Sequence, residues 1–273
     1  MKTEDYLYHY TNLRTLELIL KNKTIRFKSL NNMDDIQEEE TADLKNIGQF
    51  VYISSWTDDE KESIPMWDRY ASLDSGIRIR LRRNPFKVYD NYASDLSSVF
   101  NGKIIDESEG KSFKTIIPLV EMFTKGFIIQ PMFEDILYKV EYTDDRKKLY
   151  PYILEENEDF SIMLGRLGKY KNSYWAFQNE WRYIFTALPL NLNQSSLDIY
   201  NDFRISAYKM KKEMERQPFP YYDMVIEDDA FSKMEITMGP CINRENRKYI
   251  QDLIKKYNAS AQLKESNLCG LIR

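Results

Sequence analysis

The chain has 273 residues, a formal net charge of −4 and a pI near 5.4. A chain of this length can bury a sizeable core without disulfide or metal support, and we expect a single domain over residues 1–273. The acidic balance argues against a dedicated binder of duplex nucleic acid, because phosphate contacts need a basic face. One histidine and two cysteines without CxxC spacing supply too few ligands for a zinc site.

No part of the sequence predicts export or membrane insertion. The first residues lack the apolar core of a signal peptide, and no apolar run approaches the length of a membrane span. We therefore expect a cytoplasmic protein without a membrane partner.

The first third of the chain combines strand signals with two helix signals. Leucines at helical spacing predict a helix over 12–21, and Thr11 is expected to be its N-cap. The acidic stretch 34–43 is expected to be a loop with a short solvated helix. Pro65 suits the first turn of a helix, which predicts a short helix over 66–72. Strands, predicted from β-prone or alternating residues, lie at 6–11, 24–29, 49–56 and 76–81.

The rest of the chain begins with a segment that has no clear periodicity. Residues 84–130 carry clusters of Ser, Asp, Gly and Lys and are expected to form a helical insertion with loops. One or two helices are predicted over 144–171, and an amphipathic helix over 243–257. The strands expected in this part lie at 136–142, 181–187, 223–226, 235–238 and 268–272.

The order of these elements predicts an α+β fold. Strands do not alternate regularly with long helices, which argues against a doubly wound parallel sheet. We expect a split, mostly antiparallel sheet with flanking helices.

Three segments place a polar residue on or just after an aromatic-rich strand. His9, the sole histidine, ends the first strand together with Thr11. A serine pair at 54–55 ends the third strand and is followed by Tyr70 on the short helix. Glu180 opens a later strand. These are the polar groups that the sequence offers for chemistry.

The motifs built on these residues resemble a known family. They are Tyr8-His9-Tyr10-Thr11 with its leucine-rich helix, Arg26-Phe27-x-Ser29, Trp67-x-x-Tyr70-Ala71, Glu180-Trp181-Arg182 and Gly239-Pro240. In order and spacing they resemble the bacterial domain of unknown function 2971 family. The likeness runs from the first strand to the last helix and leaves the middle insertion uncovered.

This layout is in turn similar to the ADP-ribosyltransferase superfamily of the His-Tyr-Glu type. The resemblance implies an ADP-ribosyltransferase-like fold with NAD as the substrate. It implies that His9 bonds the adenosine-side ribose, that Tyr70 stacks on the nicotinamide and that Glu180 bonds the nicotinamide-side ribose. The serines would hold the carboxamide, and Thr11 would support the ribose contact. The further NAD-contacting residues expected are Tyr10, Thr11, Arg26, Ser54, Ser55 and Arg182.

The implied function is an NAD-consuming enzyme that transfers ADP-ribose to a protein or nucleic acid, or hydrolyses NAD, as a bacterial toxin or antiphage effector. Breaking the ribose–nicotinamide bond develops positive charge on the sugar, as in glycoside hydrolysis. A carboxylate aimed at the ribose stabilises that charge most in the transition state. An aromatic face can hold the flat nicotinamide ring by stacking. This chemistry needs no metal.

Each of these residues also has a structural interpretation. A lone histidine on an aromatic strand, or one tyrosine among 20, is often a packing residue. Arg182 lies on the same face of its strand as Glu180, so the two can form a structural ion pair. Arg26 either contacts a phosphate or lies solvated at a sheet edge. Two other functions stay open: a non-catalytic module that binds a nucleotide or a protein, and an RNA-phosphate-transferring enzyme, which needs a more basic pocket.

Overall fold

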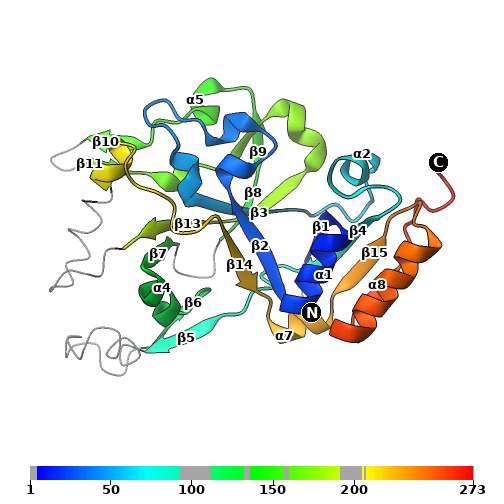
Figure 1. Ribbon diagram of the computed structural model, residues 1–273. Helices are drawn as coiled ribbons and strands as arrows, with labels where there is room; N and C mark the ends of the chain where they lie inside the picture. Colours follow the sequence, from blue (N-terminus) through cyan, green and yellow to red (C-terminus); the bar gives the residue numbers. More distant parts are fainter. Residues whose placement is uncertain are drawn as a thin grey trace.

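The computed structural model describes residues 5–92, 112–131, 136–156, 160–190, 205 and 207–272. In this part of the chain the largest sheet has ten strands and is mostly antiparallel, with helices packed around it (Figure 1). Its main path runs β14-β2-β3-β1-β4-β15-β16, and β13 branches from β3 to pair with β7 and β8. The expected α+β class with a mostly antiparallel sheet is confirmed.

The strands predicted in the first third all form. They are β1 (Tyr6–Asn12), β2 (Thr24–Ser29), β3 (Val51–Thr57) and β4 (Gly76–Arg82). The helix α1 (Leu13–Asn22) follows β1, but its N-cap is Asn12, because the Asn12 Oδ1 accepts the Thr15 amide at 2.9 Å. The prediction of Thr11 as the cap is wrong by one residue, since β1 continues through Asn12.

The sheet splits at β3. One edge of β3 pairs with β13 (Glu180–Pro189) along its whole length. β1 and β2 share the other edge of β3. In β1, Tyr8 pairs with Thr57. In β2, Lys28 pairs with Ile53 and Ser29 with Tyr52. Between these two contacts β1 and β2 diverge from each other. The predicted split is therefore present: on this edge, residues 54–56 of β3 pair with no described strand.

Short helical turns connect these strands. The acidic stretch 34–43 contains the 3₁₀ turn η2 (Ile36–Glu39), but Glu38 on it is buried, so the expectation of a solvated helix is wrong there. The predicted helix over 66–72 is α2 (Ile64–Met66) continued by the π-helical turn η4 (Trp67–Ala71). Other single turns are η1 (Leu30–Asn32), η3 (Ile47–Phe50), η6 (Leu164–Arg166), η7 (Ser173–Gln178) and α7 (Asp228–Ser232).

The insertion expected at 84–130 holds more strand than helix in its described residues. It contains β5 (Tyr89–Tyr92), β6 (Ser112–Thr115), the helix α4 (Leu119–Lys125) and β7 (Phe127–Gln130). β5 and β6 form a separate antiparallel pair, and β7 joins the main sheet beside β13. Residues 93–111 lie outside the described part of the chain.

The helices predicted over 144–171 are largely wrong. Among the described residues of this segment, only α5 (Arg146–Leu149) is an α-helix. Pro151 follows α5 and disfavours continuation of the helix. The Asp43 carboxylate then accepts hydrogen bonds from the amides of Ile153 and Leu154 at 3.0 and 2.7 Å, so these amides do not take part in a helix. The rest of the segment forms β10 (Leu154–Glu156), β11 (Phe160–Ile162), η6 and β12 (Tyr170–Asn172).

The strand predicted at 136–142 forms as two strands, β8 (Leu137–Lys139) and β9 (Glu141–Thr143). The strand is interrupted between them because β8 pairs with β13, whereas β9 pairs with β12. The strand predicted at 181–187 is confirmed within the longer β13.

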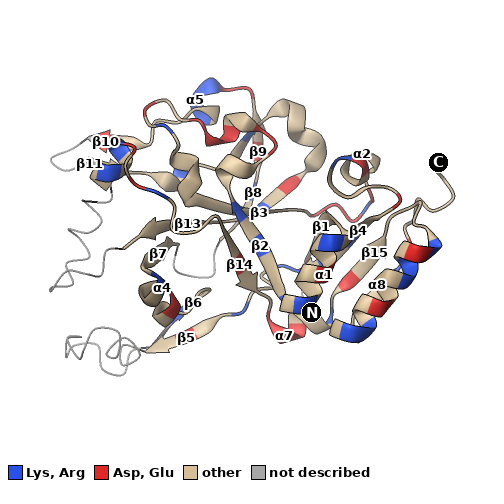
Figure 2. Ribbon diagram, in the orientation of Figure 1, with Lys and Arg blue, Asp and Glu red and all other residues tan. Residues whose placement is uncertain are grey.

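The C-terminal part confirms two strands and a helix and corrects one strand. β14 (Tyr221–Val225), β15 (Glu235–Met238) and α8 (Arg244–Tyr257) form as expected. Acidic and basic residues alternate along α8 (Figure 2). The last strand is β16 (Gln262–Lys264), and 268–272 consists mainly of turns. The amides of Cys269 and Leu271 close turns, because they donate to the carbonyls of Ser266 and Leu268 at 3.1 and 3.0 Å.

The two largest buried cores lie on opposite faces of the sheet. Side chains alternate along a strand, so Tyr52 and Phe185 enter the larger core, under α1 and α8. Ile53 and Ile184 enter the smaller core, which packs against η1, η3 and η6. Among the described helices none is both long and apolar enough to cross a membrane.

Candidate functional site

A cleft of about 430 Å³ opens where β1 and β2 diverge from β3. Its walls come from β1, α1, β2 and β3, from the turn η4 and from the start of β13. His9, Tyr70 and Glu180 all line it, although Tyr70 lies 61 positions after His9 and Glu180 lies 110 positions after Tyr70. The other residues predicted to contact NAD line it too: Tyr10, Thr11, Arg26, Ser54, Ser55 and Arg182. The split sheet brings together every predicted site residue.

His9 bridges the split in the sheet. Its Nδ1 lies 2.8 Å from the carbonyl oxygen of Ser55 on β3. A carbonyl can only accept, so Nδ1 carries the proton and Nε2 of the neutral ring keeps a lone pair. Burial lowers the pKa of His9, the Lys28 charge lowers it further, and the bond to Ser55 opposes both. The imidazole is therefore a neutral group at pH 7 that can accept a hydrogen bond at Nε2.

Tyr70 lies on the π-helical turn η4. The wider turn is closed by the Ser72 amide, which donates to the Trp67 carbonyl at 2.7 Å, and Ser72 itself takes a left-handed φ of 99°. A π-turn and a strained residue are both features that recur at functional sites. The half-buried Tyr70 accepts a hydrogen bond from the Gln178 amide. Burial and the charges of Asp34 and Glu180 raise the pKa of Tyr70 to about 12, so its hydroxyl stays protonated at neutral pH.

Glu180 opens β13 and is 4% exposed. Its carboxylate accepts from Arg182 at 2.7 Å (Nε to Oε1) and 3.0 Å (Nη2 to Oε2), and Lys171 Nζ lies 3.3 Å from Oε2. Burial alone would raise the pKa of Glu180, but the charges of Arg182 and Lys171 and a hydrogen bond with Ser55 outweigh it and hold the pKa at about 2. The structural Glu180–Arg182 pair is confirmed, and Glu180 is an anion at neutral pH.

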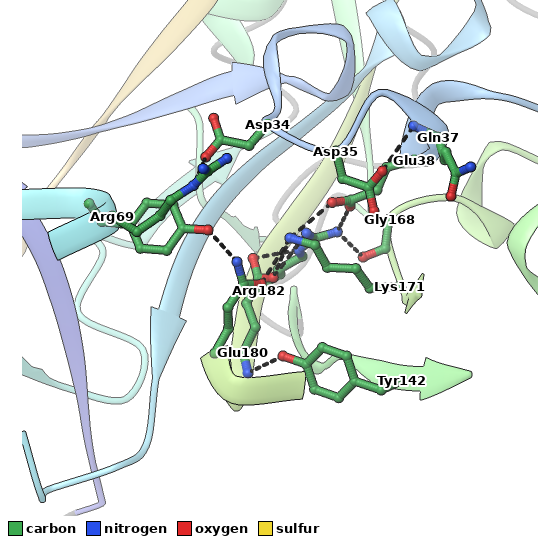
Figure 3. A network of polar contacts seen from close by, with 12 residues as sticks. Asp34, Asp35, Gln37, Glu38, Arg69, Tyr142, Gly168, Lys171, Glu180 and Arg182 are labelled. Atoms are coloured by element: carbon green, nitrogen blue, oxygen red, sulfur yellow. Dashed lines mark hydrogen bonds and ion pairs between the residues drawn. The ribbon is translucent and has the colours of Figure 1, made fainter. Parts of the chain in front are cut away.

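A fourth charged residue, Glu38, completes this buried network (Figure 3). Glu38, from η2, accepts from Arg182 Nη1 and lies 3.1 Å from Lys171 Nζ. Arg182 Nη1 also donates to the Gly168 carbonyl at 3.0 Å. Two carboxylates therefore face two cations, and their charges cancel. Because Arg182 is fully enclosed by these partners, it holds Glu180 in the cleft wall and is not itself presented to a ligand.

Lys171 and Gln178 line the cleft, whereas Glu38 lines the separate cavity and reaches the cleft only through the buried network; none of the three was predicted from the sequence. Glu38 sits in an acidic run that resembles a solvated loop, and Lys171 in a segment predicted to be helical. Gln178 lies two residues before Glu180, a local signal that could have pointed to it. Long-range packing is what brings the other two to the site.

Two of the residues predicted to contact NAD are already engaged at the edges of the cleft. Arg26 forms a bidentate pair with Asp223 at 2.8 and 2.9 Å and lies over the Tyr221 ring. Tyr10 is buried edge-on against Trp67, and its hydroxyl accepts from the Ser63 amide at 3.2 Å. Tyr10 is therefore held in place by packing and a hydrogen bond, and the Arg26 charge is shared with a carboxylate.

No protein-family model, curated protein or solved structure matches this chain. Within the described residues, no group of three or more His, Cys, Asp or Glu side chains is placed to hold a metal ion. The site is consequently defined by its own geometry. It offers a neutral imidazole, a protonated phenol and a buried carboxylate around one cleft.

Proposed function

We propose that this chain binds NAD in the cleft and breaks the bond between nicotinamide and ribose. The observation that supports this most is that His9, Tyr70 and Glu180, which the motifs single out, line one cleft. The split of the sheet at β3 agrees with an ADP-ribosyltransferase-like fold. The motif resemblance is the support for a role as a bacterial toxin or antiphage effector.

The proposed chemistry follows from the state of each group. As the bond from the ribose C1′ to nicotinamide breaks, nicotinamide leaves with the electron pair and positive charge develops on the sugar. The Glu180 carboxylate, ionised at neutral pH, faces the cleft and stabilises that charge. Water or an acceptor group then bonds to C1′ and gives up a proton. The products are nicotinamide and either ADP-ribose or an ADP-ribosylated macromolecule.

The two other residues have positioning tasks. Neutral His9 can accept a hydrogen bond from a ribose hydroxyl at Nε2, because Nδ1 donates to the Ser55 carbonyl. The ring of Tyr70 offers an aromatic face for nicotinamide, and η4 fixes that ring at the cleft wall. Ser55 joins β3 to both His9 and Glu180.

The experiment compares Glu180→Gln with Glu38→Gln. Both substitutions remove one carboxylate from the same buried network, but Glu38 lines a separate cavity of about 10 Å³ behind the cleft. Both variants should therefore lose similar stability. Only Glu180→Gln should lose nicotinamide release, by about 100-fold or more, as expected for a group that stabilises developing charge. Absence of NAD binding and cleavage by the wild-type chain would overturn the proposal.

A second candidate is a module that binds a nucleotide without turning it over. The observation in its favour is that both oxygens of Glu180 are already engaged by Arg182 and Lys171. In that case wild type and Glu180→Gln bind NAD or ADP-ribose with the same affinity, and neither releases nicotinamide.

A further inference from the structure

Lys171 connects Tyr70, through Gln178, to the Glu180 carboxylate. It comes from β12, is 5% exposed and lines the cleft. Its Nζ lies 2.9 Å from Gln178 Oε1, 3.3 Å from Glu180 Oε2 and 3.1 Å from Glu38 Oε1. The ammonium group of Lys171 thus donates to Gln178 and to Glu180, and it forms an ion pair with Glu38.

This arrangement fixes the orientation of the Gln178 amide. An ammonium group only donates, so the amide atom that faces Lys171 must be the oxygen. The amide nitrogen then faces the Tyr70 hydroxyl and donates to it. Tyr70 is consequently an acceptor toward Gln178, and its own proton must point to a different acceptor.

We propose that Lys171 and Gln178 are positioning residues that make the Tyr70 hydroxyl a hydrogen-bond donor to an oxygen of the ligand in the cleft. The inference rests on the proposed function, because the ligand is taken to be NAD. It adds a second task to Tyr70, whose ring stacks while its hydroxyl donates. The oxygen it contacts is a hydrogen-bond acceptor, such as those of a carboxamide or a ribose.

Gln178→Glu tests the direction of the hydrogen bond with almost no change of shape. A carboxylate at position 178 accepts and cannot donate, so the Tyr70 proton turns toward it and away from the ligand. NAD binding should weaken about tenfold, the effect of one lost hydrogen bond. Tyr70→Phe, which keeps the ring, should weaken it equally, and the double variant should weaken it no further. Gln262→Glu on β16 adds the same charge on the surface and serves as the control.

The role of Lys171 is tested without leaving a charge unpaired. The double variant Lys171→Met/Glu38→Gln removes one cation and one carboxylate, so the pair of Glu180 and Arg182 stays neutral. The Gln178 amide is then free to rotate, and NAD binding should weaken as it does in Gln178→Glu. Glu38→Gln alone, which leaves Lys171 in place, should bind NAD as wild type does.

A ligand-free measurement separates this inference from the proposed function. The ring Cζ signal of Tyr70 in ¹³C-tyrosine-labelled protein, assigned by its loss in Tyr70→Phe, reports whether the phenol donates or accepts. It should shift in Gln178→Glu and in Lys171→Met/Glu38→Gln but not in Gln262→Glu. If the wild-type chain does not bind NAD, the proposed function fails while this signal still decides the direction of the bond. An unchanged Tyr70 signal in Gln178→Glu, or wild-type NAD affinity in Tyr70→Phe, would overturn the inference.

Discussion

Arg182 lies two residues after Glu180 on β13 and holds its carboxylate in a bidentate pair, with Nε–Oε1 and Nη2–Oε2 distances of 2.7 and 3.0 Å. Residues i and i+2 of a strand share a face, so the strand itself sets this geometry. Both residues are buried, at 0% and 4% exposure. A buried ion pair repays its desolvation only while every partner is present.

Removal of the Arg182 side chain should therefore destabilise the folded protein strongly. Arg182→Met leaves Glu38 and Glu180 buried with only Lys171 as a cation. The free energy of unfolding, measured with urea, should fall by about 3–5 kcal/mol. Arg14→Met, on the exposed side of α1, should change it by less than about 0.5 kcal/mol. A loss below about 1 kcal/mol in Arg182→Met would show that the network is not coupled as the distances indicate.

Acid should destabilise the protein through Glu180. Its pKa is about 2 in the folded chain against an ordinary value of 4.5, so the folded state releases this proton more readily than the unfolded state. The resulting stability is fully present above about pH 5 and is lost as the pH falls through 4.5 toward 2. This contribution to the free energy of unfolding is about 3 kcal/mol. Urea unfolding between pH 5.5 and 2.5 should show this decline in wild type and a shallower one in Glu180→Gln, and equal slopes would contradict it.

His9 should titrate below its ordinary pKa of 6.5. Burial lowers the pKa of His9 most, and the Lys28 charge lowers it further. The single histidine gives one set of ring signals, so NMR of untagged protein measures it directly. Lys28→Met should raise this pKa, and Lys45→Met, at an exposed position, should not. The stability from neutral His9 is present above pH 6.5 and lost below it. A His9 pKa at or above 6.5 would contradict its neutral state in the cleft.

Sequence reasoning located the strands because their signals are local. Ile25 and Phe27 alternate with basic residues along β2, and both are buried in the core. The split was predicted from the order of the strands. Which edge of β3 each neighbour takes was not, since that depends on pairings between distant segments.

The buried network could not be predicted in the same way. Glu38 becomes a core residue only because η2 folds over Arg182, which lies 144 positions away. Lys171 reaches Glu180 through the pairing of β12 with β9, which replaces the expected helix. The local pattern of an acidic loop and of a helix-prone segment carries no information about such partners.

Gly76 controls the placement of Tyr70 from outside the cleft. A Cβ atom on Gly76 would lie 2.2 Å from the Ser72 carbonyl oxygen and 2.6 Å from the Ala71 Cβ. Both neighbours belong to the end of η4, the turn that carries Tyr70. Because the closest atom is backbone, η4 must move to admit a methyl group.

Gly76→Ala should therefore reduce the free energy of unfolding by about 1–3 kcal/mol, as overpacking does. It should also shift the Tyr70 Cζ signal and weaken NAD binding, although residue 76 does not line the cleft as described. Gly165→Ala is the matched control, because a Cβ there meets no atom within 4 Å. Urea unfolding and ¹³C-tyrosine NMR on the two variants make the comparison. Wild-type stability together with an unshifted Tyr70 signal in Gly76→Ala would mean that η4 is not held by this contact.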